Sequence, residues 1–196
     1  MEISFEKNRP SGFGECFTFD EGPNLKVPKN WLRRIAYLFL DQRYSSTVLF
    51  RLTQYFFDGS RPIWSRLVSR MNGIMNGIEA NPRASAGAGI VFHHRRVVFG
   101  GETELGRAVH LFANVNFGLR NGGHPKVGDY VQIFANCVIT GPITIGNYAI
   151  IAPDSVVKKD IPEYAIVAGN PAEVIKYRKI PDDPGVQYGE RGPGSE

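Results

Sequence analysis

The side chains best suited to acid–base chemistry near neutral pH are the four histidines, His93, His94, His110 and His124. An imidazole titrates close to that pH and can take the proton of an alcohol, which is too weak an acid to ionise by itself. Glu79 stands fifteen residues before His94. A carboxylate that accepts the second ring proton of an imidazole fixes its tautomer and stabilises the imidazolium. This pair predicts general-base activation of a hydroxyl group, with His94 as the base.

An unbroken six-residue period of apolar residues predicts the fold that must position these groups. It runs through Val127, Ile133, Ile139, Ile145, Ile151 and Val157. The period matches neither an α-helix nor a simple strand, but it matches the hexapeptide repeats of parallel β-helices, in which each hexad supplies one flat side of a coil. Small or aliphatic residues four positions into the hexads are expected to pack at the corners: Val131, Cys137, Ile143, Ala149 and Ser155. A run of ordinary strands that share a spacing by chance is the weaker alternative, because loop lengths usually vary.

The same period extends upstream, so the β-helix is expected to span residues 78–170. Its earlier positions are Ala80, Ala86, Phe92 and Val98, followed after a slip of one residue by Leu105, Leu111 and Phe117. Three hexads make a coil of about eighteen residues. The fifteen-residue spacing is therefore expected to stack Glu79 next to His94.

Between Phe117 and Val127 the spacing is ten residues rather than six. This predicts a loop pushed out of the coil at residues 118–125, which holds three glycines and His124. Loops carried on a rigid scaffold are where binding and catalytic groups concentrate. A tolerated surface insertion is the alternative.

A helical region is expected at residues 29–77, before the β-helix. Asn30 is the expected N-cap of a first helix, and Ser45 or Ser46 of a second. Pro62 opens a third from a first-turn position. Arginines interleave with the apolar faces of these helices, which favours a solvated helix face over contact with a membrane surface.

The two ends of the chain lack the six-residue period. Residues 1–28 are predicted to form an extended arm. Residues 171–196 are predicted to form a short closing helix, at 172–178, and a Gly- and Pro-rich mobile tail, at 181–196.

Composition excludes several classes of protein. The chain has 196 residues, 42% hydrophobic and 21% charged, which suits one soluble protein of one or two compact units. Two cysteines and no secretory signal predict a reducing, cytoplasmic setting, and no apolar stretch is long enough to span a bilayer. The net charge of +4 suits an anionic small molecule or the acidic inner face of a membrane, and no nucleic-acid-binding motif is present.

Four short segments carry a family resemblance: EANP at 79–82, GIVFHH followed by VVF and GET within 89–103, GGHPKV at 122–127, and VAGNPA at 167–172. In this order they resemble serine acetyltransferases and their hexapeptide-repeat relatives in polysaccharide biosynthesis. The resemblance covers about residues 45–178. It implies a mainly β protein with a left-handed parallel β-helix, a homotrimer, and acetyl-CoA as the acetyl donor.

The resemblance also implies roles for individual residues. His94 matches the catalytic histidine, and Glu79 stands where the family has an aspartate, which is one methylene shorter. His124 resembles a second histidine that helps to hold the acceptor, and His93 and Arg120 are further acceptor-side candidates. His110, which has no motif around it, is expected to be a packed residue.

The resemblance implies that acetyl-CoA and the acceptor meet in a cleft between neighbouring subunits. The backbone near Gly118 is a candidate donor to the oxyanion that forms during acetyl transfer. The candidate cofactor-binding residues are Gly118, Gly122, Gly123, Ala135 and Lys158. Catalytic zinc is not expected, because the gamma-class carbonic anhydrases use a histidine pair separated by four residues and this chain has none.

The expected acceptor departs from serine at two positions. His93 replaces an aspartate that helps to bind the amino group, and Gly123 replaces an arginine that helps to bind the carboxylate. A buried ammonium and carboxylate without partners would cost several kcal/mol, although Arg95, Arg96 or Arg120 are candidates to replace one contact. These differences predict an O-acetyltransferase that acts on a carbohydrate hydroxyl by direct transfer. The alternatives are transfer to serine or another small amino acid, and a non-catalytic trimeric scaffold.

Overall fold

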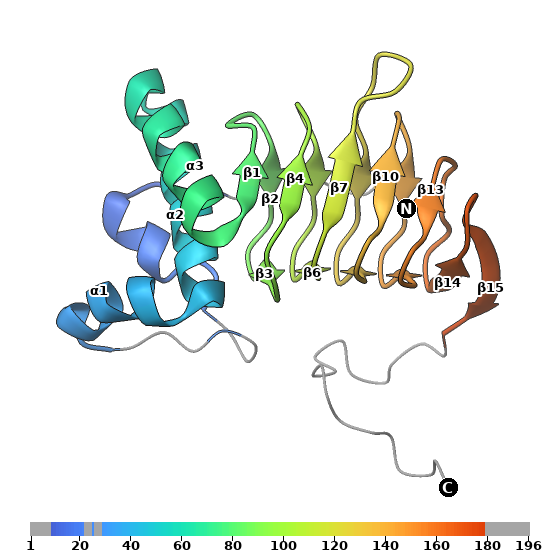
Figure 1. The fold of residues 1–196 in the computed structure, drawn as a ribbon, viewed down its shortest axis with the longest axis horizontal. Coiled ribbons are helices and arrows are strands. Elements are labelled where there is room, and N and C mark those ends of the chain that lie inside the picture. The colour runs from blue at the N-terminus through green and yellow to red at the C-terminus, as the bar shows by residue number, and fades with distance from the viewer. Residues whose placement is uncertain (1–8, 22–24, 26–28, 179–196) are drawn as a thin grey trace, which may run out of the picture.

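The computed structural model describes residues 9–21, 25 and 29–178, and shows helices followed by a three-sided solenoid of short strands (Figure 1). The predicted mobile tail and parts of the predicted arm lie outside the described residues. The N-terminal elements are a 3-10 helix η1 (Phe13–Phe17), α1 (Trp31–Leu40), α2 (Gln42–Asp58) and α3 (Pro62–Asn76). The strands are β1 (Ile78–Ala80), β2 (Ser85–Ala86), β3 (Val91–Phe92), β4 (Val97–Phe99), β5 (Glu104–Leu105), β6 (His110–Leu111), β7 (Val115–Gly118), β8 (Lys126–Val127), β9 (Gln132–Ile133), β10 (Val138–Thr140), β11 (Thr144–Ile145), β12 (Ile150–Ile151), β13 (Val156–Val157), β14 (Ala165–Ala168) and β15 (Glu173–Tyr177).

From β1 to β13 every third strand stacks in one sheet, so each of these coils contributes one strand to each of three sides. The sheets have the orders β1-β4-β7-β10-β13, β2-β5-β8-β11 and β3-β6-β9-β12-β14-β15. Pairing is parallel except between β14 and β15. This arrangement is the parallel β-helix that the six-residue period predicts.

The predicted interior positions form the core of the solenoid. All six downstream positions are fully buried: Val127, Ile133, Ile139, Ile145, Ile151 and Val157. The predicted corner residues are buried too: Val131, Cys137, Ile143, Ala149 and Ser155. Aliphatic side chains therefore stack on one another from coil to coil, and their burial is the main stabilising contribution.

One upstream position is wrong. Val98 is only half-buried, whereas its neighbours Val97 and Phe99 point inward. The slip therefore lies between Phe92 and Phe99, at the corner that carries His93 and His94. Paired residues Ile78 and Val97 are nineteen positions apart, against eighteen for Val97 and Val115. The first coil has one extra residue at this corner.

The insertion loop is confirmed between the end of β7 at Gly118 and the start of β8 at Lys126. It projects beyond the other turns of the solenoid (Figure 1). Arg120 and Gly123 exchange two backbone hydrogen bonds, at 3.3 and 3.1 Å, which close a tight turn at its tip. The loop therefore has a defined shape rather than being a loose excursion.

Helix α2 closes the open end of the first coil. Its Phe50 is buried, and the ring centroids of Phe92 and Phe99 lie 5.8 and 5.7 Å from that of Phe50. The N-terminal segment packs on the other side of α2, where Tyr44 donates a hydrogen bond to the carbonyl oxygen of Phe17. The predicted extended arm is thus wrong for residues 13–17, which fold as η1 because α2 offers them an apolar surface.

Two of the three predicted helix starts are confirmed. The side chain of Asn30 accepts a hydrogen bond from the amide of Leu32, and Pro62 occupies the first turn of α3. The predicted cap at Ser45 or Ser46 is wrong. Asp41 caps α2 instead, and its side chain accepts a hydrogen bond from the amide of Tyr44 at 3.1 Å. A carboxylate suits this position because it pairs with free first-turn amides and its negative charge interacts favourably with the helix dipole.

The predicted C-terminal helix is wrong, because Glu173–Tyr177 form β15 instead. This strand pairs antiparallel with β14, the strand of the last coil. Val174, Ile175 and Tyr177 favour strands, and β15 covers an edge that would otherwise present unpaired backbone groups.

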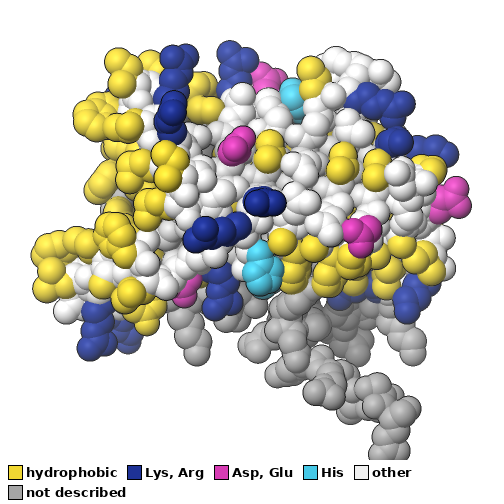
Figure 2. Space-filling model, viewed as in Figure 1, with side chains coloured by type: hydrophobic (Ala, Val, Ile, Leu, Met, Phe, Trp, Pro, Cys, Tyr) yellow, Lys and Arg dark blue, Asp and Glu magenta, His cyan; other side chains and the backbone are white. Residues whose placement is uncertain are grey.

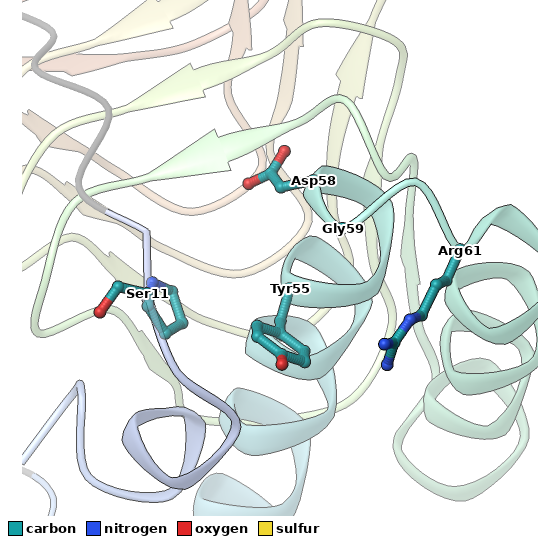
Figure 3. Close-up of a pocket in the computed structure, with 6 residues that line it drawn as sticks. Ser11, Tyr55, Asp58, Gly59 and Arg61 are labelled. Carbon is teal, nitrogen blue, oxygen red and sulfur yellow. The ribbon is translucent and has the colours of Figure 1, made fainter.

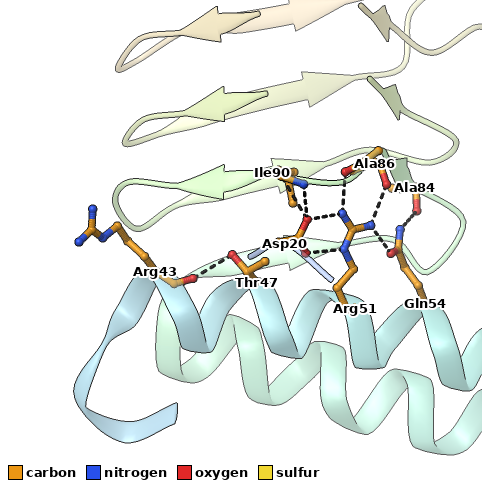
Figure 4. A network of polar contacts seen from close by, with 10 residues as sticks. Asp20, Arg43, Thr47, Arg51, Gln54, Ala84, Ala86 and Ile90 are labelled. Atoms are coloured by element: carbon orange, nitrogen blue, oxygen red, sulfur yellow. Dashed lines mark hydrogen bonds and ion pairs between the residues drawn. The ribbon is translucent and has the colours of Figure 1, made fainter. Parts of the chain in front are cut away.

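A buried ion pair joins the N-terminal segment to α2 and the first coil (Figure 4). Arg51 is fully buried and donates two hydrogen bonds to Asp20, both at 2.7 Å. It also donates to the carbonyl oxygens of Ala86 and Gly87, at 2.7 Å each. Asp20 in turn accepts from the amide of Gly89 at 2.8 Å. Every partner of this network is needed, because a buried charge without its partner is strongly unfavourable.

Within the described residues, no helix combines the length and apolar composition that a bilayer span requires.

We expect Asp20→Asn to lower the free energy of unfolding by about 3–5 kcal/mol, because it leaves the Arg51 guanidinium buried without a counter-charge. Urea unfolding followed by circular dichroism measures this loss. The matched control is Glu102→Gln in the exposed Arg83–Glu102 pair, which should lose less than about 1 kcal/mol. Equal losses in the two variants would contradict the structural role of the buried pair.

Candidate active site

The candidate base, His94, lies at the corner between β3 and β4 and is exposed to solvent. Its ring centroid is 6.3 Å from that of Phe112 on the next coil. The extra residue of the first coil widens this corner. His94 is accordingly placed where an external molecule can reach its imidazole.

His93 has different surroundings, as expected for adjacent residues on an extended chain. Its Nε2 lies 2.9 Å from Nδ1 of His110, and its ring stacks on Phe112 with centroids 4.4 Å apart. Burial lowers the pKa of both His93 and His110 to about 4. Both rings are therefore neutral at pH 7, and the N–H of one ring donates a hydrogen bond to the bare nitrogen of the other. His110 is confirmed as a packed residue.

The predicted stacking of Glu79 on His94 is wrong. The register pairs Glu79 with Val98, four residues beyond His94. The physical reason is the length of the first coil. Residues that stack on each other there are nineteen positions apart, whereas Glu79 and His94 are only fifteen positions apart.

Glu79 instead lines a groove of about 790 Å³ between α3 and the strands β1 and β4. The floor includes Asn81, Val98, Gly100 and Gly101, and the helix side includes Arg66, Ser69, Arg70 and Ile74. Arg66 and Arg70 are exposed, and neither forms a hydrogen bond or ion pair with any residue that the structure describes. The groove thus carries one carboxylate and two available guanidinium groups.

Arg66 and Arg70 are functional candidates that sequence reasoning missed. Residues four apart lie on one face of a helix, which was a readable signal. That signal does not identify the groove, because the packing of α3 against β1 follows from tertiary contacts.

His124 lies beyond the other end of β4. Its ring packs against the backbone of Gly101, where a Cβ atom would overlap the imidazole. Gly101 also has a positive φ of 54°, so glycine suits this position twice over. Nδ1 of His124 is buried and has no hydrogen-bond partner among the described residues. Within one chain, His124 and His94 are therefore not brought together: they flank opposite ends of β4.

The candidate cofactor residues fall in two places. Gly118, Gly122 and Gly123 belong to the end of β7 and its loop, together with the acceptor-side candidate Arg120. Val157 pairs with Ile139, so the next residue, Lys158, lies level with Thr140. Thr140 in turn pairs with Gly118. Gly118 and Lys158 therefore share one column of the solenoid, whereas Arg120, Gly122 and Gly123 lie on the loop. Ala135 instead lies between β9 and β10, before the strand rather than after it.

A second hollow, of about 330 Å³, lies between the N-terminal segment and the link from α2 to α3. Ser11, Tyr55 and Arg61 line it (Figure 3). The carboxylate of Asp58, which also lines it, pairs with Arg9 at 2.6 Å. The described lining of this hollow contains no histidine, whereas the groove at Glu79 is lined by Gly101, against which the ring of His124 packs. The groove at Glu79 is the better candidate for an acceptor site.

No group of three or more His, Cys, Asp or Glu residues with the geometry of a metal site occurs in the described part of the chain.

Comparisons with known proteins agree with the solenoid. Residues 124–159 match the family described as bacterial transferase hexapeptide (six repeats). The chain is 35% identical over 130 residues to serine acetyltransferase 2 of Arabidopsis thaliana, covering 64% of this chain and 40% of that protein. It is 31% identical over 138 residues to the serine acetyltransferase of Haemophilus influenzae, covering 66% and 51%. The chain thus spans about half, or less, of the length of these curated relatives.

The fold itself matches solved structures. A serine acetyltransferase in complex with CoA superposes with a TM-score of 0.71 at 26% identity, covering 83% of this chain and 69% of that one. The expected β-helix class is confirmed by this match and by the three parallel sheets. Its left-handed winding stays a prediction from the resemblance.

The His93–His110 pair predicts a pH dependence of stability. Each histidine has a folded-state pKa of about 4, below the ordinary value near 6.5. The unfolded chain therefore binds more protons between those values, so this contribution is complete above about pH 6.5 and is lost as the pH falls toward 4. We expect His110→Gln to unfold with a shallower loss of stability across that window, measured as the urea midpoint against pH. His94→Gln, at an exposed histidine, is the control, and identical slopes in wild type and His110→Gln would contradict the assignment.

Proposed function

We propose that the chain is a hexapeptide-repeat acetyltransferase that moves an acetyl group from acetyl-CoA to a hydroxyl oxygen. The observation that carries the proposal is the exposed His94 at the widened corner of the first coil, inside the region that is similar to serine acetyltransferases. One such relative has been solved with CoA. An accessible imidazole on a rigid coil is the group that hydroxyl activation requires.

In the proposed reaction, His94 takes the proton of the acceptor hydroxyl as its oxygen attacks the thioester carbonyl. The tetrahedral intermediate then expels the sulfur of CoA, which receives the proton from the imidazolium. The C–O bond forms, the C–S bond breaks, and the base returns to its neutral form. The register places Glu79 opposite Val98 rather than opposite His94, so Glu79 is proposed as a groove residue rather than as the partner of the base.

Direct transfer without an acetylated enzyme is supported by the two cysteines. Both Cys16 and Cys137 are buried. Burial raises the pKa of Cys16 to about 12 and that of Cys137 to about 11. A thiol that stays protonated at neutral pH is a poor nucleophile.

We also propose that the complete site forms between neighbouring copies in a homotrimer. The support is the separation of His94 and His124 at opposite ends of β4 in one chain. A neighbouring copy that presents its loop to the corner of the first would bring the two histidines to one acceptor. The buried Nδ1 of His124, which lacks a partner among the described residues, is consistent with a site that one chain leaves incomplete.

Serine, or another small amino acid, is the first candidate acceptor. The relatives reported above are serine acetyltransferases. The groove carries Glu79 opposite Arg66 and Arg70, so it offers an anion for an ammonium group and cations for a carboxylate. These residues stand in for the two charged contacts whose loss at His93 and Gly123 argued against an amino acid.

A carbohydrate hydroxyl is the second candidate acceptor, because the neutral, hydrogen-bonded His93 is unsuited to bind an ammonium group. A polar but uncharged imidazole pair suits a sugar.

We expect His94→Ala to lower the rate of acetyl transfer at least about a hundredfold, since general-base catalysis contributes that much or more. Release of the CoA thiol, followed with a thiol-reactive dye, measures the rate with each acceptor. Lys176→Gln on β15 serves as the control and should keep wild-type activity. A His94→Ala protein that folds and keeps most of its activity would exclude His94 as the base, and a wild-type protein with no transfer to any acceptor would favour the non-catalytic scaffold.

A panel of L-serine, L-homoserine, glucose and N-acetylglucosamine separates the two acceptors by mass spectrometry of the products. We expect L-serine to be acetylated. The double variant Arg66→Gln, Arg70→Gln should raise the KM for L-serine about tenfold or more with a smaller change in kcat, because charged hydrogen bonds contribute about 1.5–3 kcal/mol each. Arg61→Gln, outside the groove, should leave both constants unchanged. Acetylation of the sugars alone would reject the amino-acid assignment.

A further inference from the structure

The exposed surfaces of α1 and α3 are unusually apolar. Ten large hydrophobic side chains on these helices are between 43% and 79% exposed: Trp31, Leu32, Ile35, Phe39, Leu40, Ile63, Trp64, Leu67, Met71 and Ile74. We call this set the apolar face. Figure 2 shows hydrophobic side chains gathered over the helices, whereas the solenoid presents a mixed surface. Exposed apolar surface on this scale marks an interaction site rather than ordinary scatter.

The apolar face is not an unfinished core. Helix α3 buries its opposite side, with Ser65, Val68 and Asn72, while Ile63, Leu67 and Ile74 line up on the outer side. Helix α1 has no buried residue at all, although it carries the N-cap and the regular hydrogen bonds of a stable helix. A short helix of this kind gains little stability alone, so a further surface is needed to bury its apolar side.

The charges around the apolar face indicate what kind of external surface covers it. Residues 29–77 contain one lysine and seven arginines against two aspartates, Asp41 and Asp58. Only Arg51 among these cations is buried with a partner carboxylate. Exposed arginines lie beside the apolar face on both helices: Arg33, Arg61, Arg66 and Arg70. Basic groups beside a stripe of Trp, Phe, Leu and Ile are the composition of a helix that lies in a membrane interface.

A second copy of the chain is the less suitable occupant. An interface between two copies of this face would bring two surfaces with an excess of arginines together, and like charges brought together across an interface repel. An anionic lipid surface supplies the opposite charge and accepts the apolar side chains at the same time.

We propose that α1 and α3 dock the protein on the surface of a bilayer that contains anionic phospholipid, with both helices lying in the interface and neither crossing it. Ile74 and Arg70 belong to α3 and also line the groove at Glu79. The groove therefore opens at the edge of the docked surface. This inference does not depend on the acetyl-transfer proposal.

Binding of the full chain to vesicles tests the inference. Sedimentation with phosphatidylcholine vesicles, with and without added phosphatidylglycerol, should show binding that increases with the anionic lipid and decreases with salt. We expect the triple variant Trp31→Ser, Phe39→Ser, Ile63→Ser to bind at least about tenfold more weakly, because it removes large apolar side chains from the interface. Arg33→Gln with Arg61→Gln should reduce the preference for phosphatidylglycerol.

The matched control replaces three exposed apolar residues at the other end of the solenoid: Val174→Ser, Ile175→Ser and Tyr177→Ser. It should bind vesicles as wild type does. Far-UV circular dichroism confirms that each variant is folded, and analytical ultracentrifugation without vesicles compares their masses. Absence of vesicle binding, or equal loss in the control, would overturn the inference. A lower mass of the Trp31/Phe39/Ile63 variant, with vesicle binding unchanged, would show that the apolar face joins copies of the chain instead.

Discussion

The structure depends on the stacking of identical positions from one coil to the next. Each inward aliphatic side chain rests on its counterpart in the coils above and below, and the parallel ladders keep these counterparts in register. One change in coil length therefore shifts every residue that follows relative to the coil before. The candidate site lies where the coil length changes. An extra residue widens the corner at His94, and four extra residues form the loop of His124.

The solenoid could be predicted from the sequence because its period is a local property of the chain. Six inward positions downstream of the loop are buried as expected. The prediction that Val98 points inward was wrong because Val97, Val98 and Phe99 are all apolar. Hydrophobicity alone therefore does not show which of them faces the core. The prediction of a closing helix, where the structure has the strand β15, was wrong for a different reason. The free edge that Glu173–Tyr177 cover is created by the last coil and is invisible in the segment itself.

The candidate site was predictable in its chemistry more than in its geometry. His124 stands on the predicted loop, whereas His94 lies at a corner that was not predicted. Glu79 was paired with the wrong residue, because distance along the chain does not give the column in a coil of irregular length. The groove that Glu79 shares with Arg66 and Arg70 requires α3 to pack against β1, a long-range contact that no local pattern specifies.

The Arg51–Asp20 network has a kinetic consequence. Asp20 accepts hydrogen bonds from backbone amides 69 and 70 residues further along the chain. The contacts within the coils span about eighteen residues and need only short closures. Contacts of high sequence separation slow folding, because the entropy of closing a long loop is lost before the contact is gained. The segment that carries Asp20 is thus among the last to be fixed in place. Until then, the guanidinium at the mouth of the first coil depends on water for its missing partner.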